Sequence, residues 1–217
     1  MSSLKILTLA GVAALGLAGA AHAQDADASR WFVHVGPADV ILQPKMSMTA
    51  GGGAVPGAAV SIPNEWTVEG EIGYFLNKNV AVAFAGGYPP TLTFTGSGSI
   101  AALGKAGSAV AGPSALNVSY HFNRGGMVQP YVGAGAAFMI VWSTKDAALS
   151  NVKVDNAVGA EVQAGADLWL NQHWGAFVDY KRAWLDTTAK GMLGPAPVVS
   201  KIQLNPTVVN AGVTYRF

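Results

Sequence analysis

The chain has 217 residues, of which 51% are hydrophobic and 12% are charged, and it contains no cysteine. Its 13 basic and 12 acidic side chains nearly balance, which excludes the basic surface that nucleic-acid binding requires. This length suits one domain, stabilised by packing or by a closed hydrogen-bonded network and not by disulfides.

The first 23 residues have the pattern of a secretory signal. Lys5 precedes an apolar stretch over residues 6–20, and the small residues Ala21 and Ala23 follow. A basic residue, an apolar run and a small-residue cleavage site are typical of signal peptides. We therefore expect export and cleavage after Ala23, which leaves one domain over residues 24–217. No later stretch has 18 apolar residues, so membrane-spanning helices are excluded.

Alternating polarity then predicts eight β-strands. They cover residues 30–42, 64–76, 79–88, 114–122, 129–142, 157–170, 174–184 and 209–217. In the second, for example, Trp66 and Val68 alternate with Thr67 and Glu69, which is the period of a two-faced strand. Helices are expected to be short loop pieces at most.

The connections between these strands alternate in length. Tight turns are predicted at residues 77–79, 123–127 and 171–173, and long Gly-, Pro-, Ser- and Ala-rich loops at 43–63, 89–112, 143–156 and 186–200. Outer-membrane barrels have an even strand number, short periplasmic turns and long extracellular loops. The sequence therefore predicts an all-β fold, an eight-stranded antiparallel up-and-down transmembrane barrel.

Aromatic side chains on the predicted outer face gather at the strand ends. One group lies at the short-turn or terminal end (Trp31, Tyr74, Tyr120, Phe122, Trp174, Tyr215 and Phe217), and another at the long-loop end (Trp66, Trp142 and Trp184). Membrane barrels carry two such girdles, whereas aromatics that cap a soluble core would not segregate. We therefore expect outer-membrane lipid as the partner of this face.

The opposite face would line the interior and carries charged and amide side chains: Glu69, Glu71, Glu161, Gln163, Asp167, Asp179, Lys181 and Arg216. Buried charges must pair and hydrogen-bond, so a structural polar network is one interpretation. A plug that closes or tunes a passage on the periplasmic side is the other. Eight strands enclose little more than their own side chains, which excludes a general porin.

Small residues also lie on this inner face: Ala81, Ala83 and Ala85 in one strand, and Gly133, Gly135 and Ala137 in another. They could leave a narrow channel, or they could make room for the long side chains opposite. Both interpretations stay open at this point.

Catalytic and metal-binding patterns are weak. Glu69 and Glu71 could act as the paired carboxylates of a glycosidase, but their spacing is also the pitch of a strand face. His34, His121 and His173 lack metal-ligand spacing. We therefore expect no enzyme activity, no metal and no cofactor.

The long loops are apolar for exposed segments, with Met46 and Met48 in the first, Leu92, Phe94, Ile100 and Leu103 in the second, and Met192 and Leu193 in the fourth. Flexible Met side chains suit a pocket that accepts varied apolar ligands. Packing of the loops against one another is the alternative.

Three segments carry a family resemblance: QPYVGAGAAF from Gln129, VGAEVQAGADLWLNQHWGAFVDYKR from Val158 and LNPTVVNAGVTYRF from Leu204. They resemble the OmpW family of bacterial outer-membrane proteins, including its alkane-uptake relatives. The most specific features are Asp179, the Asn205–Pro206 pair and the terminal Tyr-Arg-Phe. The similarity covers essentially the whole mature chain, although the first two loops diverge.

The resemblance implies an apolar channel that opens outward and carries small hydrophobic molecules across the outer membrane without energy input, with a lateral exit between strands as one end of the path. The candidates for solute capture are then Met46, Met48, Leu92, Phe94, Met139 and Met192. The candidates for a charged plug are Glu69, Glu71, Glu161, Asp179, Lys181 and Arg216. Two other functions stay open: a structural or adhesive barrel without transport, and a soluble lipocalin-like periplasmic carrier.

The last eight residues, NAGVTYRF, resemble the C-terminal signal by which outer-membrane barrels are recognised for assembly. The matching positions are Asn210, Gly212, Tyr215 and Phe217. The outer-membrane assembly machinery is therefore an expected partner. We expect this strand to pair with the first one near Trp31, which would leave no open edge.

Overall fold

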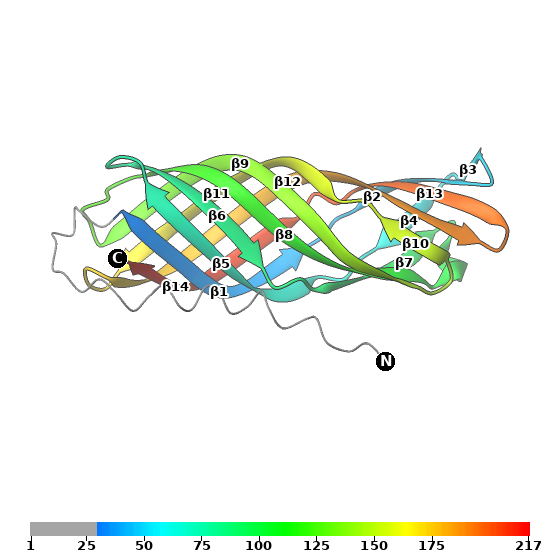
Figure 1. Cartoon of the computed structure of the whole chain (residues 1–217), viewed down its shortest axis with the longest axis horizontal. Coiled ribbons are helices and arrows are strands. Elements are labelled where there is room, and N and C mark those ends of the chain that lie inside the picture. The colour runs from blue at the N-terminus through cyan, green and yellow to red at the C-terminus, as the bar shows by residue number, and fades with distance from the viewer. Residues whose placement is uncertain (1–29) are drawn as a thin grey trace.

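A computed structural model of the chain describes residues 30–217, so the expected signal peptide and its cleavage after Ala23 lie outside the described residues. The described residues form one antiparallel sheet rolled into a barrel (Figure 1). The strands that close it are β1 (Trp31–Ile41), β5 (Glu65–Phe75), β6 (Val80–Gly87), β8 (Lys105–His121), β9 (Val128–Asp146), β11 (Ala157–Trp169), β12 (Trp174–Leu193) and β14 (Thr207–Arg216). The predicted eight-stranded antiparallel barrel is confirmed.

Closure joins the two ends of the described chain. Strand β14 pairs with β1 on one side and with β12 on the other, and β11 pairs with β12. The amide of Phe217 donates to the carbonyl of Trp31 at 3.1 Å. A closed sheet pairs its backbone groups between strands, which is what a lipid environment requires.

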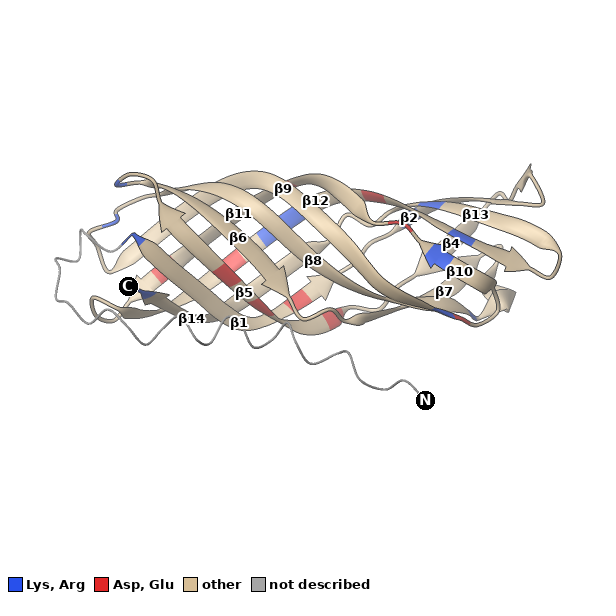
Figure 2. Cartoon of the chain, viewed as in Figure 1, with Lys and Arg blue, Asp and Glu red and all other residues tan. Residues whose placement is uncertain are grey.

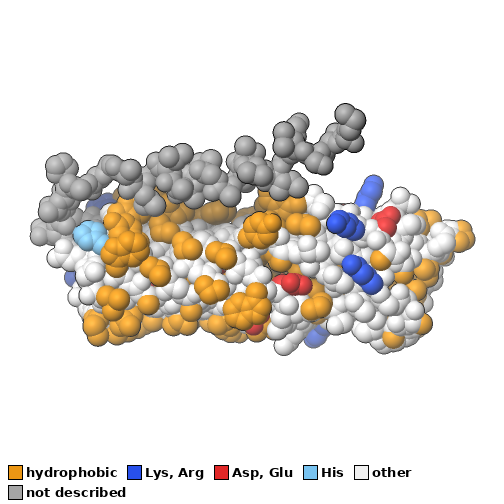
Figure 3. Space-filling model, turned by 90° about the horizontal axis from the view of Figure 1, so that it is seen from below, with side chains coloured by type: hydrophobic (Ala, Val, Ile, Leu, Met, Phe, Trp, Pro, Cys, Tyr) orange, Lys and Arg blue, Asp and Glu red, His pale blue; other side chains and the backbone are white. Residues whose placement is uncertain are grey.

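The polarity of the two faces is reversed relative to a soluble protein. Glu69 and Glu71 on β5 are buried, whereas Val68 and Ile72 beside them are exposed, at 58% and 45%. Apolar side chains cover the barrel on the face drawn in Figure 3, while Figure 2 places charged residues on the barrel strands as well as on the extension. Both predicted girdles lie on this outer face. The apolar surface therefore faces outward, as lipid contact requires.

The segments predicted as long loops hold more regular structure than expected. Strands β8, β9 and β12 continue past the barrel, and six short strands join them: β2 (Lys45–Ala50), β3 (Gly53–Ala54), β4 (Ala58–Ser61), β7 (Thr91–Gly98), β10 (Ser150–Val154) and β13 (Ala196–Gln203). Pairing of β13 with β12 and β2, and of β7 with β8 and β4, satisfies their backbone groups. The sheet thus continues beyond the barrel as a second, more polar section. We call this section the extension.

Helical structure is minimal. The 3-10 turn η1 (Ala101–Leu103) lies within residues 89–112, the second of the segments that were predicted as long loops. Across residues 30–217, no helix is long and apolar enough to span a membrane.

The small inward residues make room for long side chains. A Cβ on Gly135 would lie 2.0 Å from the carbonyl oxygen of Leu116 and 2.2 Å from Oδ1 of Asn117. A Cβ on Gly133 would lie 2.9 Å from Cγ of Gln163. Neighbouring groups therefore already occupy the space beside these two glycines, which favours the interpretation that they make room for long side chains.

Candidate functional site: apolar cavities above a polar plug

Lys181 stands at the centre of the polar interior. Its Nζ forms ion pairs with a carboxylate oxygen of Glu69, with Oδ2 of Asp179 at 2.9 Å and with Oε2 of Glu71 at 3.5 Å. All four side chains are buried. Because β1 and β14 separate β5 from β12 in the sheet, the pairs with Glu69 and Glu71 cross the lumen and join two non-adjacent parts of the wall.

His34 of β1 bridges two further carboxylates. Its Nδ1 lies 3.3 Å from Oε1 of Glu71, and its Nε2 lies 2.9 Å from Oδ1 of Asp167 on β11. An imidazole that carries protons on both nitrogens can donate to both carboxylates at once. Its ring also stacks on Phe177 at a centroid distance of 4.3 Å. Sequence analysis missed this role, although His34 alternates with exposed residues on β1 and so has inward parity.

Glu161 and Arg216 lie in the same interior but have other partners. Glu161 accepts a hydrogen bond from Nδ2 of Asn117 at 2.7 Å, and the same amide reaches Oε1 of Gln163 at 3.1 Å. Arg216 donates to Oε1 of Gln129 at 3.0 Å, and its guanidinium lies 3.8 Å from the ring centroid of Trp169. Of the six predicted plug residues, the structure thus brings together four, Lys181 and its three carboxylates, and gives the other two separate partners.

Aromatic rings fill the interior beside these charges. His121 packs against Phe75 and Tyr131, each at a centroid distance of 4.8 Å, and against Phe32 at 5.7 Å. All four of these side chains are buried. The rings and the ion pairs together form what we call the plug, and they leave little open space in the lower barrel.

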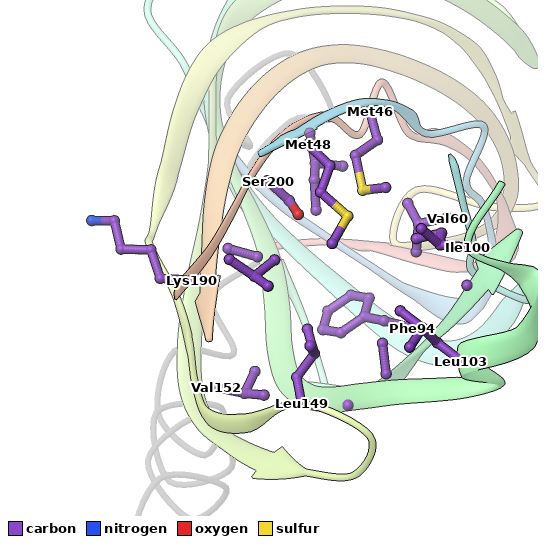
Figure 4. Close-up of a pocket in the computed structure, with 16 residues that line it drawn as sticks. Met46, Met48, Val60, Phe94, Ile100, Leu103, Leu149, Val152, Lys190 and Ser200 are labelled. Carbon is purple, nitrogen blue, oxygen red and sulfur yellow. The ribbon is translucent and has the colours of Figure 1, made fainter. Parts of the chain in front are cut away.

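Apolar cavities lie on the other side of the plug, inside the extension. The outermost has a volume of about 50 Å³, and Figure 4 shows Met46, Met48 and Phe94 converging on it. A second cavity of about 10 Å³ is lined by Leu92, Phe94 and Met139. Phe94 and Ile202 line both cavities, so the two adjoin.

Five of the six capture candidates therefore gather around two adjoining cavities. The sixth, Met192, is half-buried on β12 opposite Ser150 and Pro197 and lines neither of them. Ile100 and Leu103, apolar residues of the second predicted loop, also line the outer cavity. Sequence analysis missed Leu149 and Val152 as lining residues for a solute, because only the folding of β10 brings them beside Met46 and Met48.

A third cavity, of about 20 Å³, reaches from the plug to the barrel wall. Its lining includes Glu69 and Lys181 from the plug and Gly86, Pro113 and Ser114 from strands β6 and β8. Pairing of β6 with β8 ends at Gly86 and Ser114, and β7 resumes it at Thr91 and Val110. The interval between these pairs, which we call the β6–β8 seam, contains prolines at 89, 90 and 113, which lack an amide donor.

The interior thus has two parts, a polar barrier in the barrel and apolar cavities in the extension above it. Buried charges and aromatic rings occupy the lower lumen, and the cavities above offer Met, Leu, Val and Phe side chains to a guest. Within the described residues no group of three or more His, Asp or Glu side chains is arranged to hold a metal ion.

Comparison with known proteins agrees with this geometry. The model of the OmpW family matches residues 27–217. The chain belongs to the OmpW family. The outer membrane protein AlkL of Ectopseudomonas oleovorans is 34% identical over 170 residues, which cover 78% of this chain and 74% of AlkL. The solid-state NMR structure of AlkL in lipid bilayers matches with a TM-score of 0.70 and 30% identity, over 92% of this chain and 95% of AlkL.

Two further relatives extend the comparison. The crystal structure of OprG from Pseudomonas aeruginosa has a TM-score of 0.82 at 20% identity, over 88% of this chain and 97% of OprG, and it supports the fold alone. The dibenzothiophene metabolism operon protein PahQ of P. aeruginosa is 27% identical, over 88% of this chain and 90% of PahQ. These relatives are outer-membrane barrels or operon proteins and not enzymes by name. This OmpW-family chain is an outer-membrane barrel, so the soluble lipocalin-like carrier was a wrong alternative.

Substitution of Lys181 by Met tests the plug. The change leaves Glu69, Glu71 and Asp179 buried without their shared cation, and removing one partner of a buried ion pair costs about 3–5 kcal/mol. We expect the denaturant midpoint for unfolding in detergent micelles to fall accordingly. The matched control is Lys190→Met, which breaks an ion pair with Asp155 in which both side chains are 55% exposed, and such pairs contribute about 0–1 kcal/mol. Equal midpoints for the two variants would contradict the central role of Lys181.

Proposed function

We propose that this OmpW-family barrel admits small hydrophobic molecules through the outer membrane by passive diffusion, without catalysis. The observation that carries the proposal is the order of the interior: apolar cavities adjoin one another in the extension, and a charged plug lies below them. An apolar solute gains free energy by leaving water for such a lining. It gains nothing by entering the plug, where it would displace paired charges.

Capture begins in the outer cavity. Its volume is about 50 Å³, well below the roughly 150 Å³ of a cavity that holds benzene. Entry therefore requires Met46, Met48 and Phe94 to move. The unbranched Met side chains adapt at low cost, which suits solutes of varied shape. The name of PahQ associates that relative with dibenzothiophene, an apolar aromatic, and is in line with a solute of this class.

The exit is lateral, through the β6–β8 seam. The third cavity reaches the seam just above the plug, and the seam's prolines remove backbone donors that would otherwise pair the strands. A solute that stops at the plug thus has the barrel wall beside it, and lipid lies beyond that wall. In this scheme the plug diverts the solute, and passage needs no opening toward the periplasm.

A structural or adhesive barrel is the second candidate function, and the small volume of the cavities favours it. In that case the Met and Phe side chains would be packing residues alone.

Assembly follows the same course under both functions. The outer-membrane assembly machinery recognises the C-terminal strand, with Asn210, Gly212, Tyr215 and Phe217.

Uptake of a fluorescent apolar probe by cells with and without the protein separates the two functions. We expect uptake to rise with the wild type, and Met48→Lys to abolish most of the rise because it places a cation in the cavity. Met192→Lys is the matched control and should behave as the wild type, since Met192 lines neither cavity. Equal uptake by cells with and without the protein would leave the structural role.

A disulfide across the seam tests the exit. A Cβ on Gly112 would lie 3.4 Å from Cβ of Pro89, close to the separation in a disulfide, and the chain has no cysteine of its own. In the Pro89→Cys/Gly112→Cys variant we expect oxidation to reduce probe uptake and a reductant to restore it. Uptake that is independent of the redox state, with the disulfide verified by mass spectrometry, would contradict a lateral exit.

A further inference from the structure

Four exposed lysines lie on four neighbouring strands of the extension. They are Lys153 on β10, Lys190 on β12, Lys201 on β13 and Lys45 on β2. On β12, β13 and β2 they alternate with the inward positions of the extension, so their side chains leave from its outer face. The proposed solute path uses none of them.

The strand register joins these lysines into one row. Lys153 lies directly opposite Lys190. Lys190 and Lys201 are diagonal neighbours, because Thr188 and not Lys190 is the direct partner of Lys201. Lys201 and Lys45 are diagonal in the same way, since Lys45 is paired with Gln203. Direct and diagonal neighbours have Cβ atoms about 4.5–8 Å apart, so the four ammonium groups can approach one ligand or a line of ligands.

Acidic residues offset this charge in part. Asp155 pairs with Lys190 at 3.4 Å, and the exposed Asp186 lies on β12 opposite Gln203, beside Lys45. The carboxylate of Asp146 accepts from the amides of Asn151 and Val152 at the start of β10. Four cations thus face two nearby exposed carboxylates. The direct opposition of Lys153 and Lys190 is unfavourable unless an anion lies between them.

The lysine row lies just beyond the outer aromatic girdle of the barrel. Trp184 of the outer girdle lies on β12 with the same outward parity, two residues before Asp186 and six before Lys190. On the face drawn in Figure 3, a group of blue side chains lies directly to the right of the orange band. An open groove of about 670 Å³ lies at this level, with the outward side chains of Lys45, Asp155, Asp186 and Lys201 among its lining. The headgroups of the outer leaflet begin at the aromatic girdle.

We propose that this lysine row binds the phosphate groups of lipopolysaccharide in the outer leaflet. The lysines stand just beyond the lipid-facing surface, on the side of the long connections, where phosphates of that leaflet lie. Compact ammonium groups are suited to phosphate recognition, and an anion between Lys153 and Lys190 relieves their repulsion. The row therefore anchors one side of the extension to the membrane surface and fixes the height of the barrel in the bilayer.

Binding of lipid A to the full-length protein in phosphatidylcholine nanodiscs tests this inference. We expect diphosphorylated lipid A to bind more tightly than its dephosphorylated form. In the Lys153→Gln/Lys201→Gln variant, affinity should fall about 25-fold, at about fivefold per lysine. The matched control is Lys105→Gln/Lys145→Gln, which removes two exposed lysines of β8 and β9 that lie outside the row. The affinity of this control should fall much less than that of the row variant, because neither lysine belongs to the row.

A heat-shifted gel band verifies that each variant is folded before its affinity is compared. Wild-type affinity in the row variant, or an equal loss in the control, would overturn the proposal. So would equal binding of dephosphorylated lipid A. Displacement of lipid A by an equal concentration of inorganic phosphate would assign the row to a free anion and contradict a lipid site.

Discussion

The contact of Lys181 with three carboxylates is the interaction on which the rest of the structure depends. It joins β5 to β12 across the lumen, and His34 carries the connection on to β11 through Asp167. Charges at this depth are tolerated where they pair with an opposite charge, as around Lys181, or hydrogen-bond to an amide, as Glu161 does with Asn117 and Arg216 with Gln129. The apolar faces of the same strands are thereby free to contact lipid. One set of pairings thus fixes both the polarity of the interior and the lipid-facing surface.

The division of the interior into two parts follows from that contact. Below it, rings and paired charges occupy the space that eight strands enclose. Above it, the inner face of the sheet is mainly apolar, and cavities between Met, Leu and Phe side chains remain. The small residues at 133 and 135 serve the lower part, where Gln163 and Asn117 lie against them. The proposed path therefore turns sideways where the polar part begins, at the proline-rich seam.

The sequence predicted the structure best where polar and apolar residues alternate regularly along a strand. Alternation at period two identified the strands of the barrel and the inward position of Lys181 and its carboxylates, because parity alone decides which face a residue joins. It could not reveal that Leu149 and Val152 lie beside Met46, since this depends on pairing between distant hairpins. His34 was missed because a lone histidine gives no spacing signal. The extension was taken for loops because its glycines and prolines obscure the alternation that β13 shows.

Solvent accessibility of the interior tests most directly whether the plug is closed. Because the chain has no native cysteine, single cysteines can be placed in the lower lumen at Ala83 and in the outer cavity at Ile100, and exposed to a charged thiol reagent from each side of a reconstituted membrane. A closed plug predicts labelling at position 100 from the outside and no labelling at position 83 from either side. Rapid labelling at position 83 would show an open aqueous path through the barrel and contradict it.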